Sequence, residues 1–316
     1  MDYLDEIIGQ ETAKNFIRNA LKKGHIYNLL LAGPKGVGKR QTAFAIAKTL
    51  GCPPHSPNFM LIAPVPPSIK EKEKDEKIFD YMKTYLPENT IVKIEDHSSI
   101  VIKQIRHLIE WLLLMPAKGT KRVVIILEAD RMNEESANSF LKTLEEPPLD
   151  TIFILTSSRP DFLLPTIRSR CQIIKFSYLN NAQIANIIFD GEDNFILGSP
   201  GEIMSLRENT LLATAREIFQ KAPLSTENAV KFSRELAKEN LTDLFFGLLL
   251  FYRCVFYNQL FRDKNYEFGQ DIVSKAQRIR MDIIINTILM LNNCINLLEH
   301  NPNHLILLLN TLIKLP

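Results

Sequence analysis

The sequence predicts a chain in two parts, an α/β domain built on a parallel sheet and, after it, a region made almost entirely of helices. Three observations lead to this prediction. In the first half of the 316 residues, short aliphatic segments alternate with segments of helical periodicity. A glycine-rich stretch follows the first aliphatic segment directly. After about residue 178, the apolar residues recur only at helical spacing.

Short aliphatic segments of the first half are apolar on both faces, as expected for strands of a sheet that helices cover on both sides. They span residues 28–32, 59–63, 90–94, 122–127 and 151–156, and residues 172–176 are a further candidate for an edge strand. Helical periodicity is found at residues 11–22, 39–50, 101–114 and 134–145. For the last of these helices, Asn133 is the expected N-cap, and Pro147 and Pro148 end it.

The second half carries long apolar-periodic helices from residue 211 onward. They include 241–261, 280–298 and 305–315. The longest unbroken apolar run, residues 244–252, stops at Arg253, far short of the ~20 residues that cross a bilayer. We therefore expect a buried helix there and no membrane association.

The composition is that of a globular protein with nearly balanced charge. The sequence has 38 Lys and Arg against 36 Asp and Glu, which gives no reason to expect tight non-specific binding to nucleic acid or membranes. Its four cysteines form no C-x-x-C pair, so we expect neither a disulfide framework nor zinc. The N-terminus lacks the basic and apolar regions of a secretory signal. These features are typical of a cytoplasmic protein.

Residues 33–41 read GPKGVGKRQ and match the phosphate-binding pattern G-x-x-x-x-G-K. In such loops, backbone N–H groups turn toward phosphate oxygens, the lysine neutralises the outer phosphates, and a following Ser or Thr holds Mg²⁺. The first two functions are supplied by Gly33, Gly36, Gly38 and Lys39. The residue at the third position is Arg40.

Arg40 cannot hold a metal ion, because a guanidinium has only hydrogen-bond donors. At 4 Å from a divalent cation it would be repelled by about 8 kcal/mol at an effective dielectric constant of 20. We expect Arg40 to turn away or to lie on phosphate in place of the ion. Thr42 lies on a different helical face and does not replace the hydroxyl. The sequence thus predicts no metal site, and it leaves open whether ATP or ADP binds without hydrolysis.

The second half of a hydrolytic site is a strand that ends in acidic residues. The candidate is RVVIILEADRM, residues 122–132. If the strand runs to its natural end, Leu127 takes the place of the metal-holding Asp, and Glu128 that of the water-activating Glu. A shifted register would offer Glu128 or Asp130 to the metal instead. The alternative is that both acidic residues form a surface turn.

Five motifs together resemble the bacterial clamp-loader subunits of the AAA+ superfamily. They are IIGQ (7–10), GPKGVGKR (33–40), EADRMN (128–133), SANSFLKTLEEPP (136–148) and LLPTIRSRCQ (163–172). The resemblance extends over nearly the whole chain. Within the family, GKR in the loop resembles the delta-prime subunits of DNA polymerase III, whereas the gamma/tau ATPase subunits keep GKT or GKS.

The resemblance implies an AAA+ α/β domain over residues 1–177, a small helical lid over 178–208 and an all-α collar over 209–316. The collar would join five subunits in a ring, with gamma/tau and delta subunits as partners. The assembled complex opens the sliding clamp and loads it on primed DNA. Many relatives carry a four-cysteine zinc module after the loop helix, but only Cys52 stands in that region here, so no zinc is expected.

The resemblance also implies a role for Arg170, in the run Ser169-Arg170-Cys171. It would act as an arginine finger on ATP held by a neighbouring subunit, and Arg168 in the same turn is a second candidate. The alternative is that Arg170 only pairs with a nearby carboxylate. In hydrolysing relatives an arginine of the lid contacts the nucleotide, and Gly201 stands at that place. Ser157 and Ser158 match the polar position that senses the γ-phosphate.

The function predicted from these features is that of a non-hydrolysing stator subunit, which needs no cofactor and lends Arg170 to a neighbour's ATP site. Two alternatives remain at the level of sequence. One is an active gamma/tau-type ATPase with an unusual loop. The other is a DNA-binding protein, for which the cluster Lys118, Lys121 and Arg122 is the hint.

Overall fold

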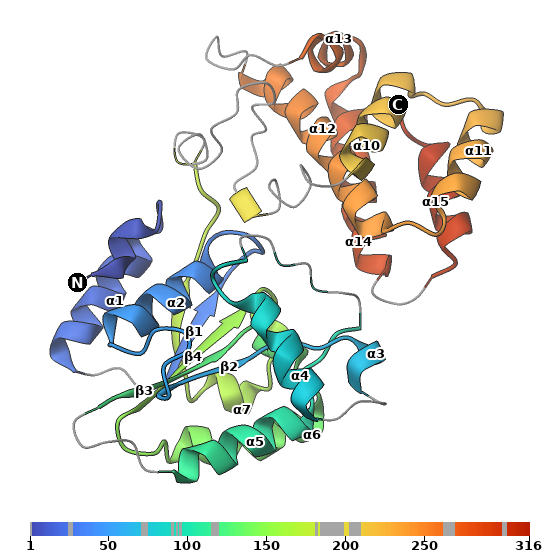
Figure 1. Cartoon of the computed structure of the whole chain (residues 1–316). Coiled ribbons are helices and arrows are strands. Elements are labelled where there is room, and N and C mark those ends of the chain that lie inside the picture. Colours follow the sequence, from blue (N-terminus) through green and yellow to red (C-terminus); the bar gives the residue numbers. More distant parts are fainter. Residues whose placement is uncertain are drawn as a thin grey trace. The chain divides into compact units, whose positions relative to one another are not determined.

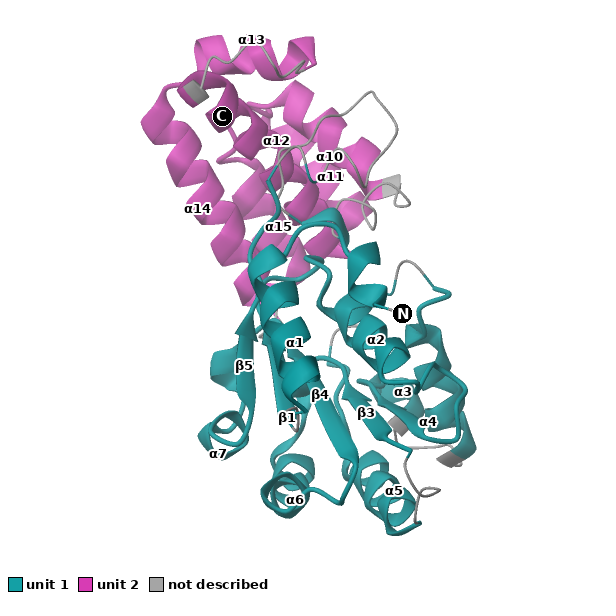
Figure 2. Ribbon diagram, turned by 90° about the vertical axis from the view of Figure 1, so that its left-hand side faces the viewer, with its two compact units in different colours: residues 1–187, 198–201 teal, residues 188–197, 202–316 magenta. Residues whose placement is uncertain are grey.

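The structure, a computed structural model, describes most of the chain. The described residues are 2–24, 28–70, 75–89, 92, 94, 97–114, 120–180, 183, 199–201, 210–261, 269–298 and 302–316. Two units are present: one comprises 1–187 and 198–201, and the other comprises 188–197 and 202–316 (Figure 2). The predicted lid, 178–208, lies mostly outside the described residues, so the division into three domains stays a prediction.

The first unit is built on a five-stranded parallel sheet (Figure 1). Its strands are β1 (Asn28–Ala32), β2 (Phe59–Ile62), β3 (Arg122–Ile126), β4 (Thr151–Ser157) and β5 (Gln172–Lys175). They lie in the order β2-β3-β4-β1-β5, and every neighbouring pair is parallel. Strands β1, β3 and β4 are buried along their whole length, which is why their sequences are apolar on both faces. The predicted fold class is confirmed.

The third predicted strand, 90–94, lies largely outside the described residues. The helices of this unit are α1 (Glu11–Lys23), α2 (Lys39–Thr49), α3 (Pro67–Lys70), α4 (Asp75–Met82), α5 (Ile102–Leu113), α6 (Glu134–Glu145) and α7 (Pro165–Arg168). The chain crosses from β1 to the edge strand β2 in one direction and then runs back through β3 and β4 in the other direction. Because parallel crossovers are right-handed, the helices of these two directions cover opposite faces of the sheet. Figure 1 shows α2 on one side of the sheet and α5 with α6 on the other.

The predicted cap of α6 is confirmed, since the Asn133 side chain accepts a hydrogen bond from the backbone N of Ser136 at 2.9 Å. Short 3-10 turns link the larger elements: η1 (Tyr3–Glu6), η2 (Lys83–Tyr85), η3 (Ala129–Arg131) and η4 (Pro160–Phe162). Of these, η3 follows β3 and η4 follows β4, so both lie at the carboxyl edge of the sheet, where β1 leads into the phosphate loop.

The second unit is helical throughout its described residues. It contains α10 (Thr210–Lys221), α11 (Thr226–Leu236), α12 (Leu241–Phe261), α13 (Gln270–Arg278), α14 (Met281–Leu298) and α15 (His304–Leu312). Helix α12 packs against α10, α13 and α14. At its centre, Phe219 of α10 stacks on Phe251 of α12 with ring centroids 5.2 Å apart.

Two of these helices, α12 and α14, are long and apolar enough to cross a membrane by length and composition alone. The core helix of a water-soluble protein passes the same test. Residues 244–252 of α12 include a continuous buried stretch from Leu248 to Tyr252, so the predicted buried helix is confirmed. Helix α14 differs, because most of its apolar stretch is not covered by its own unit.

Candidate functional site

The phosphate-loop sequence forms a strand, a loop and a helix, as the motif requires. Strand β1 ends at Ala32, Gly33 opens the loop, and α2 begins at Lys39. The backbone N of Gly33 donates to the carbonyl of Ser157 at 3.2 Å. A Cβ atom at residue 33 would collide with the carbonyl oxygen of Phe176, so the sheet leaves room only for glycine here.

Lys39 is turned back onto its own loop. Its side chain is almost fully buried, with the residue 4% exposed. The ammonium donates to the carbonyl oxygens of Gly33 and Pro34, both at 2.6 Å, and to Oγ of Ser158 at 3.0 Å. The polar position at the end of β4 therefore touches the loop lysine. To reach a phosphate, the ammonium must leave these oxygens.

Arg40 turns away from the loop, the first of the two arrangements expected. Its Nη2 donates to the carbonyl of Asn89 at 2.7 Å, and burial lowers the pKa of its guanidinium. Thr42 is fully buried, and its hydroxyl donates to the carbonyl of Gly38 at 2.9 Å. The loop glycines and Lys39 fit a phosphate group, whereas neither Arg40 nor Thr42 supplies a ligand for Mg²⁺.

Strand β3 runs to its natural end, with apolar Leu127 after its last residue. Leu127 is buried, and its backbone N donates to the carbonyl of Ile62 at 2.9 Å. Glu128 follows in the left-handed region with φ 45°. Its backbone N donates to Oγ1 of Thr156 at 2.9 Å. The position of a metal-holding carboxylate is thus occupied by an aliphatic side chain.

Asp130 is a buried anion rather than part of a surface turn. Its side chain is 1% exposed. One carboxylate oxygen accepts a hydrogen bond from Oγ of Ser157 at 2.7 Å, and the other pairs with Nε of Arg159 at 3.3 Å. The sequence-based alternative of a surface turn is wrong for this residue. Its carboxylate is occupied in joining η3 to the end of β4.

Residues 199–201 lie directly on the phosphate loop. Oγ of Ser199 donates to the carbonyl of Lys35 at 2.6 Å, and the backbone N of Gly201 donates to the carbonyl of Gly36 at 3.1 Å. A Cβ atom at residue 201 would lie 2.9 Å from the Cα of Gly36. The place where the resemblance expects an arginine is therefore in backbone contact with the loop and has no room for a side chain.

Arg170 lies at the opposite edge of the sheet from the phosphate loop. In the parallel pairing of β1 with β5, Leu29 faces Gln172 and Ala32 faces Lys175. Arg170 lies in the sequence between α7 and the amino end of β5, two elements that Figure 2 labels. The loop follows the carboxyl end of β1, about 17 Å away along the strand at ~3.3 Å per residue. Arg170 cannot reach a phosphate held by its own loop.

The guanidinium of Arg170 has two partners in the same unit. Nη1 donates to the carbonyl of Thr166 at 2.9 Å, and Nη2 pairs with Oε1 of Glu145 at 2.5 Å. The predicted ion pair with a nearby carboxylate is present. This pairing alone decides neither for nor against a role on a neighbour's ATP, so the finger role stays a prediction.

A family model described as DNA polymerase III, delta subunit, matches residues 9–180, more than half of the chain. The chain belongs to this family. It is a member of the clamp-loader group of AAA+ proteins, and the resemblance read from the motifs is confirmed.

The curated relatives of this chain include both tau and delta' subunits of DNA polymerase III. The chain is 30% identical over 240 residues to the tau subunit of Bacillus subtilis, covering 74% of this chain and 39% of the relative. It is 33% identical over 149 residues to the delta' subunit of Pseudomonas aeruginosa, covering 46% and 42%. A solved gamma-subunit-related protein from Thermotoga maritima covers 95% of this chain and 97% of its own, at 19% identity and a TM-score of 0.49. The chain spans less than half the length of the two curated relatives.

Cys52 and Arg122, which the sequence analysis considered for zinc and DNA binding, form hydrogen bonds inside this clamp-loader family member. Sγ of Cys52 donates to the carbonyl of Lys121 at 3.0 Å. Arg122 is buried and donates to the carbonyls of Leu112 and Leu114, so it is not a surface contact for DNA. Lys118 lies outside the described residues. Within the described part of the chain, no three His, Cys, Asp or Glu side chains form a group that could hold a metal.

The sequence analysis missed three residues that stabilise the two ends of the parallel strands, namely the phosphate-loop end and the Arg170 end. Gln10 of the IIGQ motif donates to the carbonyl of Ser177 at 2.6 Å and accepts from its backbone N at 3.2 Å. Asn28 donates to the carbonyls of Leu144 and Arg170 at 3.0 and 3.1 Å. Glu145 pairs with Arg170. The available signals were an amide at the start of an aliphatic strand and acidic residues at a helix C-terminus.

Proposed function

We propose that this chain is a non-hydrolysing clamp-loader subunit that lends Arg170 to ATP bound by a neighbouring subunit. The observation that carries the proposal is the position of the two sites at opposite edges of one sheet. A guanidinium that cannot reach its own loop can act only on a nucleotide supplied from outside. In such a position it neutralises charge that develops on the γ-phosphate.

The chain's own loop supports the non-hydrolysing part of the proposal. Arg40 stands where a hydroxyl would hold Mg²⁺, and its guanidinium is directed to Asn89. Leu127 stands where a carboxylate would hold the metal, and Gly201 fills the place of a lid arginine with a backbone contact. Each departure removes a different interaction with MgATP. In this proposal the subunit acts as a stator, which keeps the geometry of the ring.

An active gamma/tau-type ATPase is the competing proposal. The likeness to a tau subunit over 74% of the chain favours it, and the glycines with Lys39 fit a phosphate. The two proposals differ in what the isolated chain does with MgATP.

We expect the purified chain to release no phosphate from MgATP above the background of the Lys39→Ala variant. Arg40→Thr, which returns a hydroxyl to the loop, is expected to remain at that background as well. The reason is that Leu127 still offers no carboxylate to the metal. The measurement is steady-state phosphate release by the isolated protein. ATP hydrolysis by the isolated chain that is lost in the Lys39→Ala variant would support the gamma/tau-type ATPase instead.

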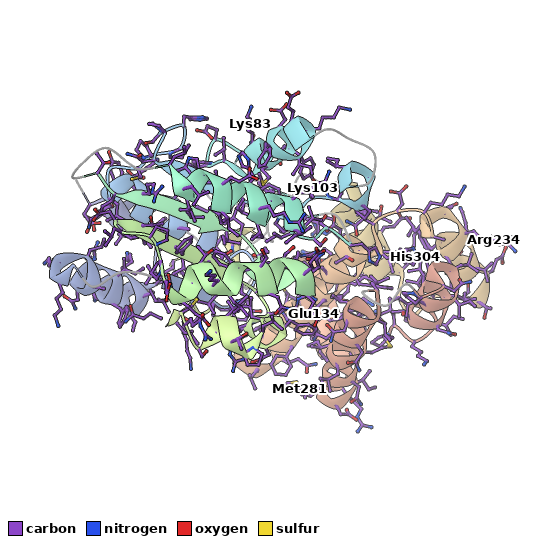
Figure 3. All side chains as sticks on the ribbon, turned by 90° about the horizontal axis from the view of Figure 1, so that it is seen from below. Lys83, Lys103, Glu134, Arg234, Met281 and His304 are labelled. Atoms are coloured by element: carbon purple, nitrogen blue, oxygen red, sulfur yellow. The ribbon has the colours of Figure 1, made fainter. Side chains whose placement is uncertain are left out.

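We propose that the apolar face of the helical unit joins neighbouring subunits. On α14, Ile285 is 42% exposed and Leu289 is 56% exposed, and on α15, Ile306 is 55% exposed. The starts of these helices are marked in Figure 3 by Met281 and His304. Ile285 and Leu289 are four residues apart and therefore share one face of α14. Large apolar side chains that share an exposed face normally mark a contact with another protein. Contacts with gamma/tau and delta subunits in the ring would cover them.

Leu289→Asp is expected to weaken incorporation into the ring about tenfold or more, because burying a leucine contributes about 1.5–3 kcal/mol and each 1.4 kcal/mol is about tenfold in affinity. The matched control is Asn228→Asp, an exposed asparagine of α11, a helix that carries none of the side chains named above. Native mass spectrometry of a titration with the organism's gamma/tau and delta subunits measures the effect. Equal incorporation of both variants would mean that α14 is not part of the subunit contact.

A further inference from the structure

Both ends of Arg170 are held by groups of its own unit. The guanidinium is bound through Nη1 to the carbonyl of Thr166 and through Nη2 to Glu145. The backbone is bound as well, since its N donates to the carbonyl of Ile167 at 3.1 Å and its carbonyl accepts from Asn28 at 3.1 Å. A long side chain with several rotatable bonds is thereby restricted to one orientation.

The position of Glu145 is unfavourable for the helix that carries it. Glu145 is the last residue of α6, and the carbonyl groups at a helix C-terminus carry partial negative charge. A carboxylate at this end is repelled by them. The Arg170 guanidinium offsets both negative charges at once. The stability of α6 therefore does not explain an acidic residue here, whereas the contact with Arg170 does.

The amide of Asn28 joins the two segments that meet at this ion pair. It is buried at the first position of β1, and its nitrogen donates to the carbonyl of Leu144 as well as to that of Arg170. Leu144 immediately precedes Glu145 in α6. The end of α6 and the backbone of residue 170 are therefore tied to the same point of the central sheet. This arrangement keeps the carboxylate and the guanidinium in fixed register.

We propose that Glu145 is a positioning residue for Arg170, an inference that rests on the proposed trans-acting role. A guanidinium has five N–H donors, and two of them bind Thr166 and Glu145. No residue in the described part of the chain is bound to the other three, and they can bind the oxygens of a phosphate presented by the neighbouring subunit. Glu145 sets the orientation of the guanidinium before assembly. The conformational entropy of the Arg170 side chain is therefore already lost before the reaction begins.

The test is ATP hydrolysis, stimulated by primed DNA and clamp, in the assembled complex containing Glu145→Ala. We expect kcat to fall about tenfold, in line with the cost of small misplacements of catalytic groups, with KM for ATP unchanged. Glu145→Gln keeps an acceptor and is expected to fall between Glu145→Ala and the wild type. The control is Glu146→Ala at the next, exposed residue, with a wild-type rate.

The variant is expected to fold, because alanine is a strong helix former and the substitution removes a carboxylate from the negative end of α6. A melting temperature at or above that of the wild type, together with a lower kcat, separates positioning from a structural role. In the Arg170→Ala background, Glu145→Ala is expected to cause no further loss, because it acts only through Arg170.

Three results would overturn the proposal: a wild-type or faster rate for Glu145→Ala, an equal loss for Glu146→Ala, or a further loss in the double variant. In each of these cases a slow Arg170→Ala variant would leave the trans-acting role standing. If Arg170→Ala itself has the wild-type rate, the proposed function fails, and the positioning role fails with it.

Discussion

Replacing Arg170 by Ala is expected to slow ATP hydrolysis at the neighbouring site by about 10³-fold, the lower end of the effect of a guanidinium supplied in trans. The physical reason is that charge develops on the γ-phosphate in the transition state, and the variant removes the cation that neutralises it. The measurement is DNA-stimulated ATP hydrolysis by the assembled complex. The phosphate-loop lysines of the other ATPase subunits are replaced, so that only the site facing Arg170 turns over.

Arg168→Ala is the matched control for this experiment. Arg168 lies in the same turn, and its Nη1 pairs with Oδ1 of Asp161 at 2.7 Å on the surface. Surface ion pairs of this kind contribute little to stability, so the variant is expected to hydrolyse ATP within about twofold of the wild type. A large loss in Arg168→Ala with a normal rate in Arg170→Ala would transfer the role to Arg168. Normal rates in both variants would rule out a finger from this turn.

Asp130→Ala is expected to destabilise the sheet-containing unit by about 2 kcal/mol, within the ~1–3 kcal/mol cost of leaving a buried hydrogen-bonding group without its partner. Ser157 loses its acceptor, and Arg159, which is 31% exposed, loses its carboxylate. The chain has one tryptophan, Trp111 in α5, so its fluorescence during urea denaturation reports the unfolding of this unit alone.

The control for Asp130 is Glu128→Asn in the same turn. Glu128 adopts φ 45°, a conformation that asparagine tolerates well, so the cost is expected to stay within about 0.5 kcal/mol. Together the two variants test whether the carboxylate of Asp130 stabilises the fold while that of Glu128 does not. An unchanged midpoint for Asp130→Ala would contradict a structural function of its carboxylate.

Most of the sheet could be predicted because buried parallel strands have a simple composition. The segments that became β1, β3 and β4 are aliphatic on both faces, and a phosphate-loop motif follows the first of them. Short helices such as α3 and α7, with four residues each, have too few turns to show a period. The tertiary contacts around them decide their conformation.

The strand, loop and helix of the phosphate-loop motif could be predicted, since their residues are adjacent in sequence. The contacts of Lys39 with the carbonyls of its own loop could not be predicted. The contacts of Asp130 could not be predicted either, because its partners are Ser157, the last residue of β4, and Arg159, which follows that strand. The surroundings of Arg170 were equally hidden. Asn28 is 142 positions away in sequence, and Glu145 is 25 positions away, so only the folded sheet brings them together.

The length of β1 has a consequence for how such a subunit can change. One end of this strand leads into the loop that would receive a nucleotide, and the other end carries the amide that binds the backbone of Arg170, the proposed donor. Arg40 and Leu127 belong to the nucleotide side and are not among the contacts that hold Arg170. Binding a nucleotide and supplying an arginine to a neighbour are therefore separate properties in this fold. A subunit can lose the ability to hydrolyse ATP and still supply the arginine.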